Sequence, residues 1–266
     1  MPDFDPGKDF RVLREPTVYL MGRQMLNEAE LQRFLADHGV SWQTDTEVAA
    51  EKLAEVAGRL CYMSFSRPRP GGNKTYLGHI LEVGHGSVLE HAAWNFLFTG
   101  VSRSLTHELV RHRAGWAYSQ LSQRYVDESV AEYVEPDDIA GDPELHRLWL
   151  DAVAHSHQAY VNLVERLQDR FKDEPDKTLR RKLARQAARS VLPNATETKI
   201  FVTANARALR HFIEQRGSRH AETEIRKLAV AVLKVMRAEA PNLFGDYRLV
   251  SLPDGTFEAV TEHRKV

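Results

Sequence analysis

A group of basic and polar residues near the middle of the chain has the composition of an anion-binding site. Arg111, His112 and Arg113 are consecutive, and Arg124 follows within the polar run 119–125. Guanidinium groups pair with phosphate oxygens in a fixed fork, and hydroxyl and amide groups complete such a site. The 266-residue chain has a formal net charge of only −1. We therefore expect a small anionic ligand in a pocket rather than a broad nucleic-acid surface.

Two further segments, at 84–91 and 205–216, share this polar character. Their candidate residues are His85, Ser87, Glu90, Asn205, Arg207, His211 and Arg216. At helical spacing the polar residues of the second segment cannot all lie on one face, so they would reach different ligands or subunits. Each segment alone is also typical of a solvated helix face or an N-cap, and only the combination favours a shared site.

Metal and cysteine chemistry are not supported by the spacing. His107 and His112 are five residues apart, so on a helix the second is rotated by about 140° from the first. A zinc-protease helix needs histidines four apart. His85 and His91 have no further ligand pattern, and we predict no metal site. Cys61 follows an apolar helical segment without an adjacent histidine, which is typical of a buried, inert cysteine.

Hydrophobic spacing predicts the elements that position these residues. Strands are expected at 17–21, 92–101 and 199–204. Helices are expected at 46–63, from the N-cap Ser102 to the arginine cluster, from the Asp142-Pro143 start to 171, at 177–191, from Asn205 onward and at 225–236. The proline- and glycine-rich segment 66–72 predicts a loop. We expect residues 1–266 to form a single α/β domain, preceded by a loose leader over residues 1–16.

The composition is that of an ordinary globular protein. Apolar residues make up 42% of the chain and charged residues 27%. We expect no transmembrane helix, because no run of 18 apolar residues occurs. The N-terminal residues lack the apolar segment of a signal peptide. The single cysteine fits a reducing compartment, so we expect a cytoplasmic protein that does not bind membranes.

In content and order, these landmarks resemble the flavin-dependent thymidylate synthases. The hallmark of that family is Arg-His-Arg, seven residues, then Ser; here eight residues separate Arg113 from Ser122. We place the extra residue within 114–117, where Gly115 can form a bulge. The resemblance also covers His-Gly-Ser-Val-Leu-Glu-His at 85–91, Ala-Arg-Ser-Val-Leu-Pro at 188–193, the Asn-Ala-Arg helix from Asn205, and 220–226.

The resemblance implies the reductive methylation of dUMP to dTMP. FAD would be the cofactor, 5,10-methylenetetrahydrofolate the carbon donor and NADPH the reductant, without an enzyme nucleophile. Arg216 corresponds to the catalytic arginine that favours ionisation of the pyrimidine. The implied cofactor-binding residues are His85, Ser87, Glu90, Arg111, His112, Arg113, Asn205, Arg207 and His211. The implied substrate-binding residues are Glu108, Arg111, Gln120, Leu121, Ser122, Arg124, Arg189 and Arg216.

The resemblance also implies an architecture and an assembly. We expect a small antiparallel sheet flanked by several long helices, in a homotetramer whose active sites combine residues of several chains. The alternative is a non-catalytic RNA- or nucleotide-binding module, suggested by the arginine-rich stretches 179–189 and 207–226. Acidic residues are interleaved with these arginines, whereas such modules usually carry a clear basic excess.

Overall fold

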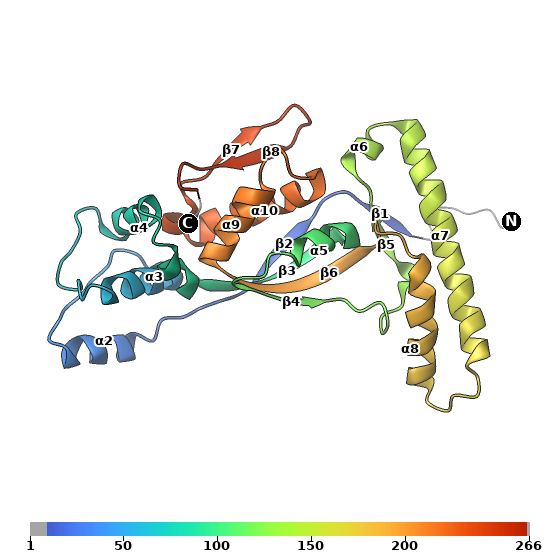
Figure 1. Ribbon diagram of the computed structural model, residues 1–266, viewed down its shortest axis with the longest axis horizontal. Coiled ribbons are helices and arrows are strands. Elements are labelled where there is room, and N and C mark those ends of the chain that lie inside the picture. The colour runs from blue at the N-terminus through green and yellow to red at the C-terminus, as the bar shows by residue number, and fades with distance from the viewer. Residues whose placement is uncertain (1–9, 265–266) are drawn as a thin grey trace. The chain divides into compact units, whose positions relative to one another are not determined.

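The computed structural model describes residues 10–264 and has a mixed α/β fold in which helices dominate (Figure 1). The α-helices are α2 (Glu28–Asp37), α3 (Ala49–Leu60), α4 (Gly72–Glu82), α5 (Arg103–Leu109), α6 (Asp137–Ala140), α7 (Pro143–Arg170), α8 (Lys177–Ala188), α9 (Ala206–Arg216), α10 (Thr223–Glu239) and α11 (Pro241–Phe244). The strands are β1 (Arg11–Leu13), β2 (Thr17–Arg23), β3 (Ala93–Ser102), β4 (Trp116–Gln120), β5 (Glu132–Val134), β6 (Glu197–Asn205), β7 (Arg248–Ser251) and β8 (Phe257–Val260). The short 3₁₀ helices are η1 (Gly86–His91), η2 (Glu128–Val130) and η3 (Arg189–Val191).

The largest sheet has the strand order β2-β3-β6-β4. The amide of Asn95 donates to the hydroxyl of Thr203 at 2.7 Å, and the backbone N–H of Gly100 donates to the carboxylate of Glu197 at 2.9 Å. Residue numbers rise along β3 as they fall along β6, so these two central strands are antiparallel. The predicted small antiparallel sheet flanked by long helices is confirmed.

Three helices begin where the sequence predicts. Ser102 accepts a hydrogen bond from the N–H of Leu105, and Asn205 accepts one from the N–H of Ala208. Asp142 caps α7, which runs from Pro143 for 28 residues. Each such cap satisfies an otherwise unpaired backbone N–H and stabilises its helix by about 1 kcal/mol. These caps fix where the helices that follow β3 and β6 start.

The chain forms two compact units, each made of separate segments. Unit 1 comprises Met1–Thr17, Phe98–Val110 and Ser119–Ile200, and unit 2 comprises Val18–Leu97, Arg111–Tyr118 and Phe201–Val266. Four of the five boundaries fall within β2, β3, β4 and β6 and the fifth follows α5, so no single linker divides the sequence. The predicted single domain over residues 1–266 therefore contains substructure that the composition does not reveal, and its status as one domain stays a prediction.

Unit 1 has a core built on β1 and β5, which pair in parallel. Phe10 and Tyr133 pack edge to face at 5.0 Å in this core, beside Val153 and Ala154 of α7. The expectation of a loose leader over 1–16 is thus wrong from Phe10 onward, because this buried aromatic anchors the strand that follows it. Residues 1–9 lie outside the described part of the chain.

Unit 2 contains the helices that carry most of the predicted cofactor residues. Its C-terminal part joins α9 and α10 to the antiparallel hairpin of β7 and β8. A separate hydrophobic cluster packs Leu31 and Leu35 of α2 against Trp42 and against Phe65, which lies between α3 and α4. The sequence did not predict α2, α4 or the hairpin. Among the described residues, no helix combines the length and hydrophobicity needed to cross a membrane.

Candidate functional site

Helix α9 of unit 2 is the platform for the candidate site. Asn205 caps its first turn, Arg207 and His211 are exposed, and Arg216 is its last residue. Arg207 and His211 lie four residues apart and share one helix face, whereas Arg216 lies at the C-terminal end. As the sequence predicts, the polar side chains of α9 do not all lie on one face of the helix.

A cavity of about 630 Å³ opens along α9, from Asn205 at its start to Gln215 in its last turn. Its lining residues are Glu90, Ala114, Gly115, Asn205, Arg207, Ala208, His211, Glu214 and Gln215. Four of the predicted cofactor residues are therefore brought together, from η1 and from α9. Arg207 donates to the carboxylate of Glu90 at 2.5 Å, and both side chains are about half exposed. This ion pair ties η1 to α9 across the cavity.

Gly115 forms the turn where the sequence is one residue longer than the hallmark. Its φ of +74° lies in the left-handed region that favours glycine. A Cβ at Gly115 would lie 2.6 Å from Nδ2 of Asn205 and 2.9 Å from Cβ of Ala208. The carbonyl of Gly115 also accepts a hydrogen bond from the N–H of Asn205 at 3.2 Å. At the predicted bulge, the backbone of Gly115 therefore lies close to the backbone of Asn205 at the start of α9.

The middle residue of the Arg-His-Arg motif contacts the far end of α9. Nε of Arg216 donates to Nε2 of His112 at 3.1 Å. The His112 ring also packs edge to face against Phe212 at 5.4 Å and His211 at 5.7 Å. His112 therefore links the motif to both the catalytic candidate and the cavity-lining face of α9.

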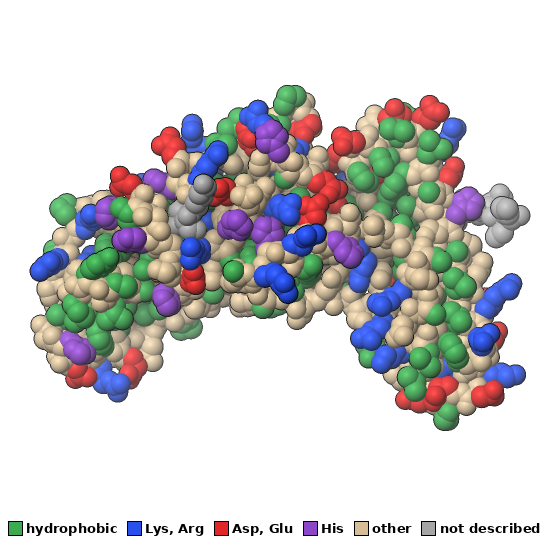
Figure 2. Space-filling view, viewed as in Figure 1, with side chains coloured by type: hydrophobic (Ala, Val, Ile, Leu, Met, Phe, Trp, Pro, Cys, Tyr) green, Lys and Arg blue, Asp and Glu red, His purple; other side chains and the backbone are tan. Residues whose placement is uncertain are grey.

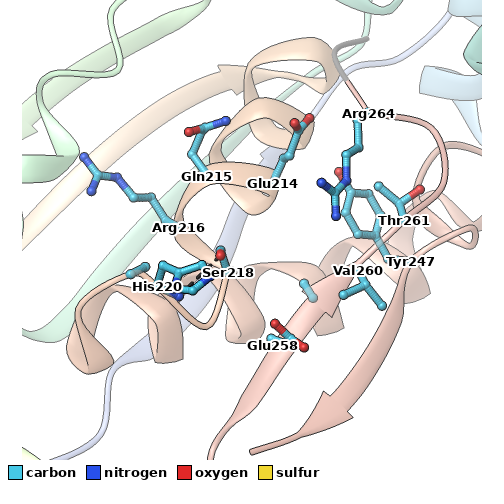
Figure 3. A pocket seen from close by; sticks show the side chains of 12 residues that line it. Glu214, Gln215, Arg216, Ser218, His220, Tyr247, Glu258, Val260, Thr261 and Arg264 are labelled. Atoms are coloured by element: carbon cyan, nitrogen blue, oxygen red, sulfur yellow. Dashed lines mark hydrogen bonds between the residues drawn. The ribbon is translucent and has the colours of Figure 1, made fainter.

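A second cavity, of about 360 Å³, is lined by Arg216 and by residues of the C-terminal hairpin, among them Glu258 and Val260. Figure 3 shows the Arg216 side chain extending away from Glu258 and Val260 of β8. The N–H of Ala259 donates to the carbonyl of Gly217 at 2.8 Å. Arg219 in the loop after α9 forms an ion pair with Glu258. The hairpin therefore fixes the backbone immediately after Arg216.

The predicted substrate-binding run lies in unit 1, at the end of β4 and just after it. The side chain of Gln120 donates to the hydroxyls of Thr106 and Thr198 at 3.1 and 3.3 Å. The N–H of Leu121 donates to the carbonyl of Lys199 at 2.9 Å, and the hydroxyl of Ser122 accepts from the backbone N–H of Arg124. These hydrogen bonds fix the backbone of this run beside β6.

Arg189 lies at the junction of α8 and η3, also in unit 1, and its side chain is exposed. Its positive charge acts on Arg103, which is not among the site residues predicted from the sequence. Burial lowers the pKa of the Arg103 guanidinium, and the charge of Arg189 adds to this effect against the opposing charge of Glu128. No local pattern identifies Arg103, because its neighbours in sequence are those of a capped helix start.

The predicted residues are divided between the two units. Unit 2 contains His85, Ser87, Glu90, Arg111, His112, Arg113, Asn205, Arg207, His211 and Arg216, and unit 1 contains Glu108, Gln120, Leu121, Ser122, Arg124 and Arg189. Within the described residues, the lining of the 630 Å³ cavity does not include His85, Ser87, Arg111 or Arg113. Their roles stay predictions.

Cys61 differs from the expectation of a buried cysteine. It follows the last residue of α3, is exposed, and its Sγ lies 3.4 Å from the carbonyl of Ala57. The neighbours Leu60, Tyr62 and Met63 are apolar but exposed, because they lie at the end of α3, where the helix extends into solvent. In the part of the chain described by the structure, no three His, Cys, Asp or Glu residues are grouped to hold a metal ion.

Comparison with known proteins identifies the family. The sequence model described as "Thymidylate synthase complementing protein" (Thy1) matches residues 44–242. The flavin-dependent thymidylate synthase of Mycobacteroides abscessus is 52% identical over 230 residues, covering 86% of this chain and 91% of that protein. The enzyme of the same name from Mycolicibacterium gilvum is 54% identical over 225 residues, covering 84% and 89%.

A solved structure shows the same fold. The UMP/dUMP methylase PolB from Streptomyces cacaoi, bound with 5-Br dUMP, superposes with a TM-score of 0.63 at 20% sequence identity. The match covers 88% of this chain and 95% of that one. With a family match over most of the sequence and relatives above 50% identity, the chain belongs to the flavin-dependent thymidylate synthases.

Proposed function

We propose that the protein catalyses the reductive methylation of dUMP to dTMP with FAD as its cofactor. The observation that carries this proposal is the cavity of about 630 Å³ beside α9, lined by Asn205, Arg207 and His211 and by the backbone turn at Gly115. It lies in a chain whose relatives are named as enzymes of this activity. The 5-Br dUMP bound to the structural neighbour supports a pyrimidine nucleotide as substrate.

The residues around the cavity fit a flavin dinucleotide. Arg207 supplies a guanidinium for an anionic group such as a pyrophosphate, and Asn205 and Gln215 supply amide groups. Gly115 allows its turn to pack directly against Asn205 and Ala208, where a Cβ would clash, so the turn and α9 together form one wall of the cavity. When bound, FAD supplies the redox chemistry, with NADPH as the reductant and 5,10-methylenetetrahydrofolate as the carbon donor.

The chain's own residues would bind and polarise dUMP. Ser122, Arg124 and Arg111, from one subunit or from several, would hold the phosphate, because hydroxyl and guanidinium groups donate to its oxygens. Arg189 and Arg216 would act on the uracil. A permanently charged guanidinium beside a ring carbonyl stabilises negative charge that develops on the pyrimidine. Glu108, Gln120 and Leu121 complete the substrate contacts, and His85, Ser87, His112 and Arg113 those of the flavin.

We also propose a cytoplasmic homotetramer with shared active sites. Large apolar side chains that a monomer would leave in water support an assembly: Met25 is 89% exposed and Leu148 is 58% exposed. Figure 2 shows hydrophobic side chains on the surface over α7. Subunit contacts would cover such side chains, and different subunits would supply different walls of one site.

The Cys61→Ser variant is expected to keep most of its activity. Cys61 is exposed at the end of α3 and its thiol donates to the carbonyl of Ala57 in the same helix. The proposed reaction needs no enzyme nucleophile. Steady-state dTMP formation by the variant and the unchanged protein, compared at matched flavin content, measures this. A variant that binds FAD but forms no dTMP would contradict the assignment.

The Gly115→Ala variant is expected to lose flavin binding. A side chain at a positive φ costs about 1–2 kcal/mol, and here the Cβ would also press on Asn205 and Ala208. The matched control is Gly39→Ala, because Gly39 has a φ of +63° but no atom within 4 Å of its Cβ position. Thermal unfolding should show the cost of the positive φ in both variants and a further loss in Gly115→Ala from its close contacts, whereas the absorbance of bound flavin should fall only for Gly115→Ala. Equal flavin content in both variants would count against the cavity as the flavin site.

The proposed function is tested by the absorbance spectrum and NADPH oxidation of the purified protein. The expected result is a yellow protein that oxidises NADPH and converts dUMP to dTMP when methylenetetrahydrofolate is present. A colourless protein that neither binds added FAD nor oxidises NADPH would overturn the proposal. Salt-dependent binding of RNA in place of these activities would favour the alternative module. Figure 2 shows acidic and basic side chains interspersed on the visible face, which does not favour that alternative.

A further inference from the structure

The hydrogen bond between Arg216 and His112 defines the protonation state of the imidazole. Nε of Arg216 carries a proton and donates it to Nε2 of His112 at 3.1 Å. A ring nitrogen accepts a hydrogen bond only when it carries no proton, so His112 is neutral with its proton on Nδ1. Protonation of Nε2 would replace the acceptor with a donor beside a guanidinium cation.

The His112 ring is held in place by aromatic neighbours. It packs against Phe212 of α9 at 5.4 Å and against Trp116 at 6.3 Å. Trp116 stacks on Tyr118 at 5.8 Å with an interplanar angle of 5°, and the hydroxyl of Tyr118 donates to the carbonyl of His112 at 2.6 Å. Side chains locked by packing and by a second layer of hydrogen bonds can hold a reacting group in a defined geometry.

Arg216 is the last residue of α9, so both its backbone and its long side chain depend on contacts outside the helix to hold their positions. Its backbone is fixed from the other side, where the N–H of Ala259 donates to the carbonyl of Gly217. The long side chain then extends away from β8 (Figure 3), and the bond from Nε to His112 restricts rotation of the guanidinium. Because Nε is engaged, the plane of the fork is set and its terminal nitrogens face a defined direction.

We propose that His112 is a positioning residue that aims the Arg216 guanidinium at the pyrimidine. This inference rests on the role proposed above for Arg216. This role of His112 is separate from its contact with the flavin. The neutral imidazole accepts a hydrogen bond from Nε of Arg216, and this bond orients the guanidinium towards the negative charge that develops on the pyrimidine. A charged group stabilises a transition state most when its orientation is set before reaction.

Two variants of the FAD-loaded protein test the role of the acceptor. His112→Phe keeps a ring among the aromatic neighbours but removes the acceptor, and His112→Gln restores an acceptor oxygen on a chain of similar reach. His107→Phe, on the exposed face of α5, controls for a histidine-to-phenylalanine change. The measurements are kcat, KM for dUMP, bound FAD per subunit, and crystal structures of the unchanged protein and of His112→Phe.

The expected result is a kcat per flavin-loaded subunit about 10²-fold lower for His112→Phe, with much of the loss recovered in His112→Gln. His107→Phe should match the unchanged protein. The crystal structures should show the Arg216 guanidinium displaced in His112→Phe. Equal kcat losses per flavin-loaded subunit in both His112 variants, or retained kcat in His112→Phe, would overturn the proposal. If the unchanged protein makes no dTMP, the proposed function fails. The positioning role is tested separately by the crystal structures, and an Arg216 guanidinium that is not displaced in His112→Phe would overturn it.

Discussion

The Arg216→Ala variant is expected to form dTMP about 10²–10³-fold more slowly while retaining its bound flavin. Removal of one group that stabilises developing charge has an effect of this size in a water-excluded site. The flavin should remain because the lining of the 630 Å³ cavity, which runs along α9 from Asn205 to Gln215 and includes the turn at Gly115, does not include Arg216. The measurement is single-turnover dTMP formation by protein of known flavin content.

The Arg216→Lys variant is the matched control for charge. Lysine keeps the positive charge but lacks the planar fork and the Nε–H that donates to His112. We expect its rate to lie closer to that of Arg216→Ala than to that of the unchanged protein. Substantial turnover by Arg216→Ala would contradict the catalytic role, and loss of flavin from that variant would place Arg216 in the cofactor site instead.

The Arg210→Ala variant is expected to lower the free energy of unfolding by about 3–5 kcal/mol. The Arg210 side chain is 2% exposed and donates to both carboxylate oxygens of Asp246 at 2.7 Å. It also donates to the carbonyl of Leu243 at 2.6 Å, and the Tyr247 hydroxyl donates to the Arg210 carbonyl. Truncation leaves the Asp246 carboxylate without its main partner and detaches the C-terminal segment from α9. Chemical denaturation measures the effect.

Arg33→Ala is the control for this loss. Arg33 forms an exposed ion pair with Glu30 at 2.7 Å, with side chains 70% and 54% exposed. Exposed pairs contribute about 0–1 kcal/mol, so this variant should unfold almost as the unchanged protein does. Similar losses in the two variants would mean that the Arg210–Asp246 pair does not hold the C-terminal segment to α9.

The same pair gives the stability a dependence on acidic pH. Burial opposes ionisation of Asp246, but the hydrogen bonds and charge of Arg210 outweigh it and hold the pKa of the carboxyl below its ordinary value. A carboxyl with a lowered pKa in the folded state stabilises the protein above its unfolded pKa. That contribution is lost as the pH falls through the lower, folded-state pKa. The loss should be absent from the Arg210→Ala variant.

The elements that could be predicted from sequence are those specified by local chemistry. Asp142-Pro143 and Ser102 mark helix starts because each satisfies backbone groups within its own turn. The alternating aromatics of β3, such as Trp94 and Phe96, mark a buried strand face. In contrast, β4 and the β7–β8 hairpin are short strands whose pairing partners are distant in sequence or whose faces are largely exposed. Local periodicity carries little information there.

The site shows the same division between local and distant information. The bulge at Gly115 could be predicted because a lengthened motif containing glycine needs a residue that tolerates positive φ. The contact between His112 and Arg216 joins residues 104 positions apart, and no spacing rule connects them. Buried charges are equally hidden: Glu55 is 1% exposed because Trp42, Arg59 and Asn73 all donate to it, and only the fold brings these donors together.

The most direct test of the central claim is anaerobic dTMP formation by FAD-free protein before and after FAD is restored. Mass spectrometry of the nucleotide product, with dUMP, methylenetetrahydrofolate and NADPH present, distinguishes the two states. The flavin-free protein should leave dUMP unchanged, and addition of FAD should restore dTMP formation in both the unchanged protein and Cys61→Ser. Formation of dTMP without flavin, or its absence after FAD has bound, would contradict this account.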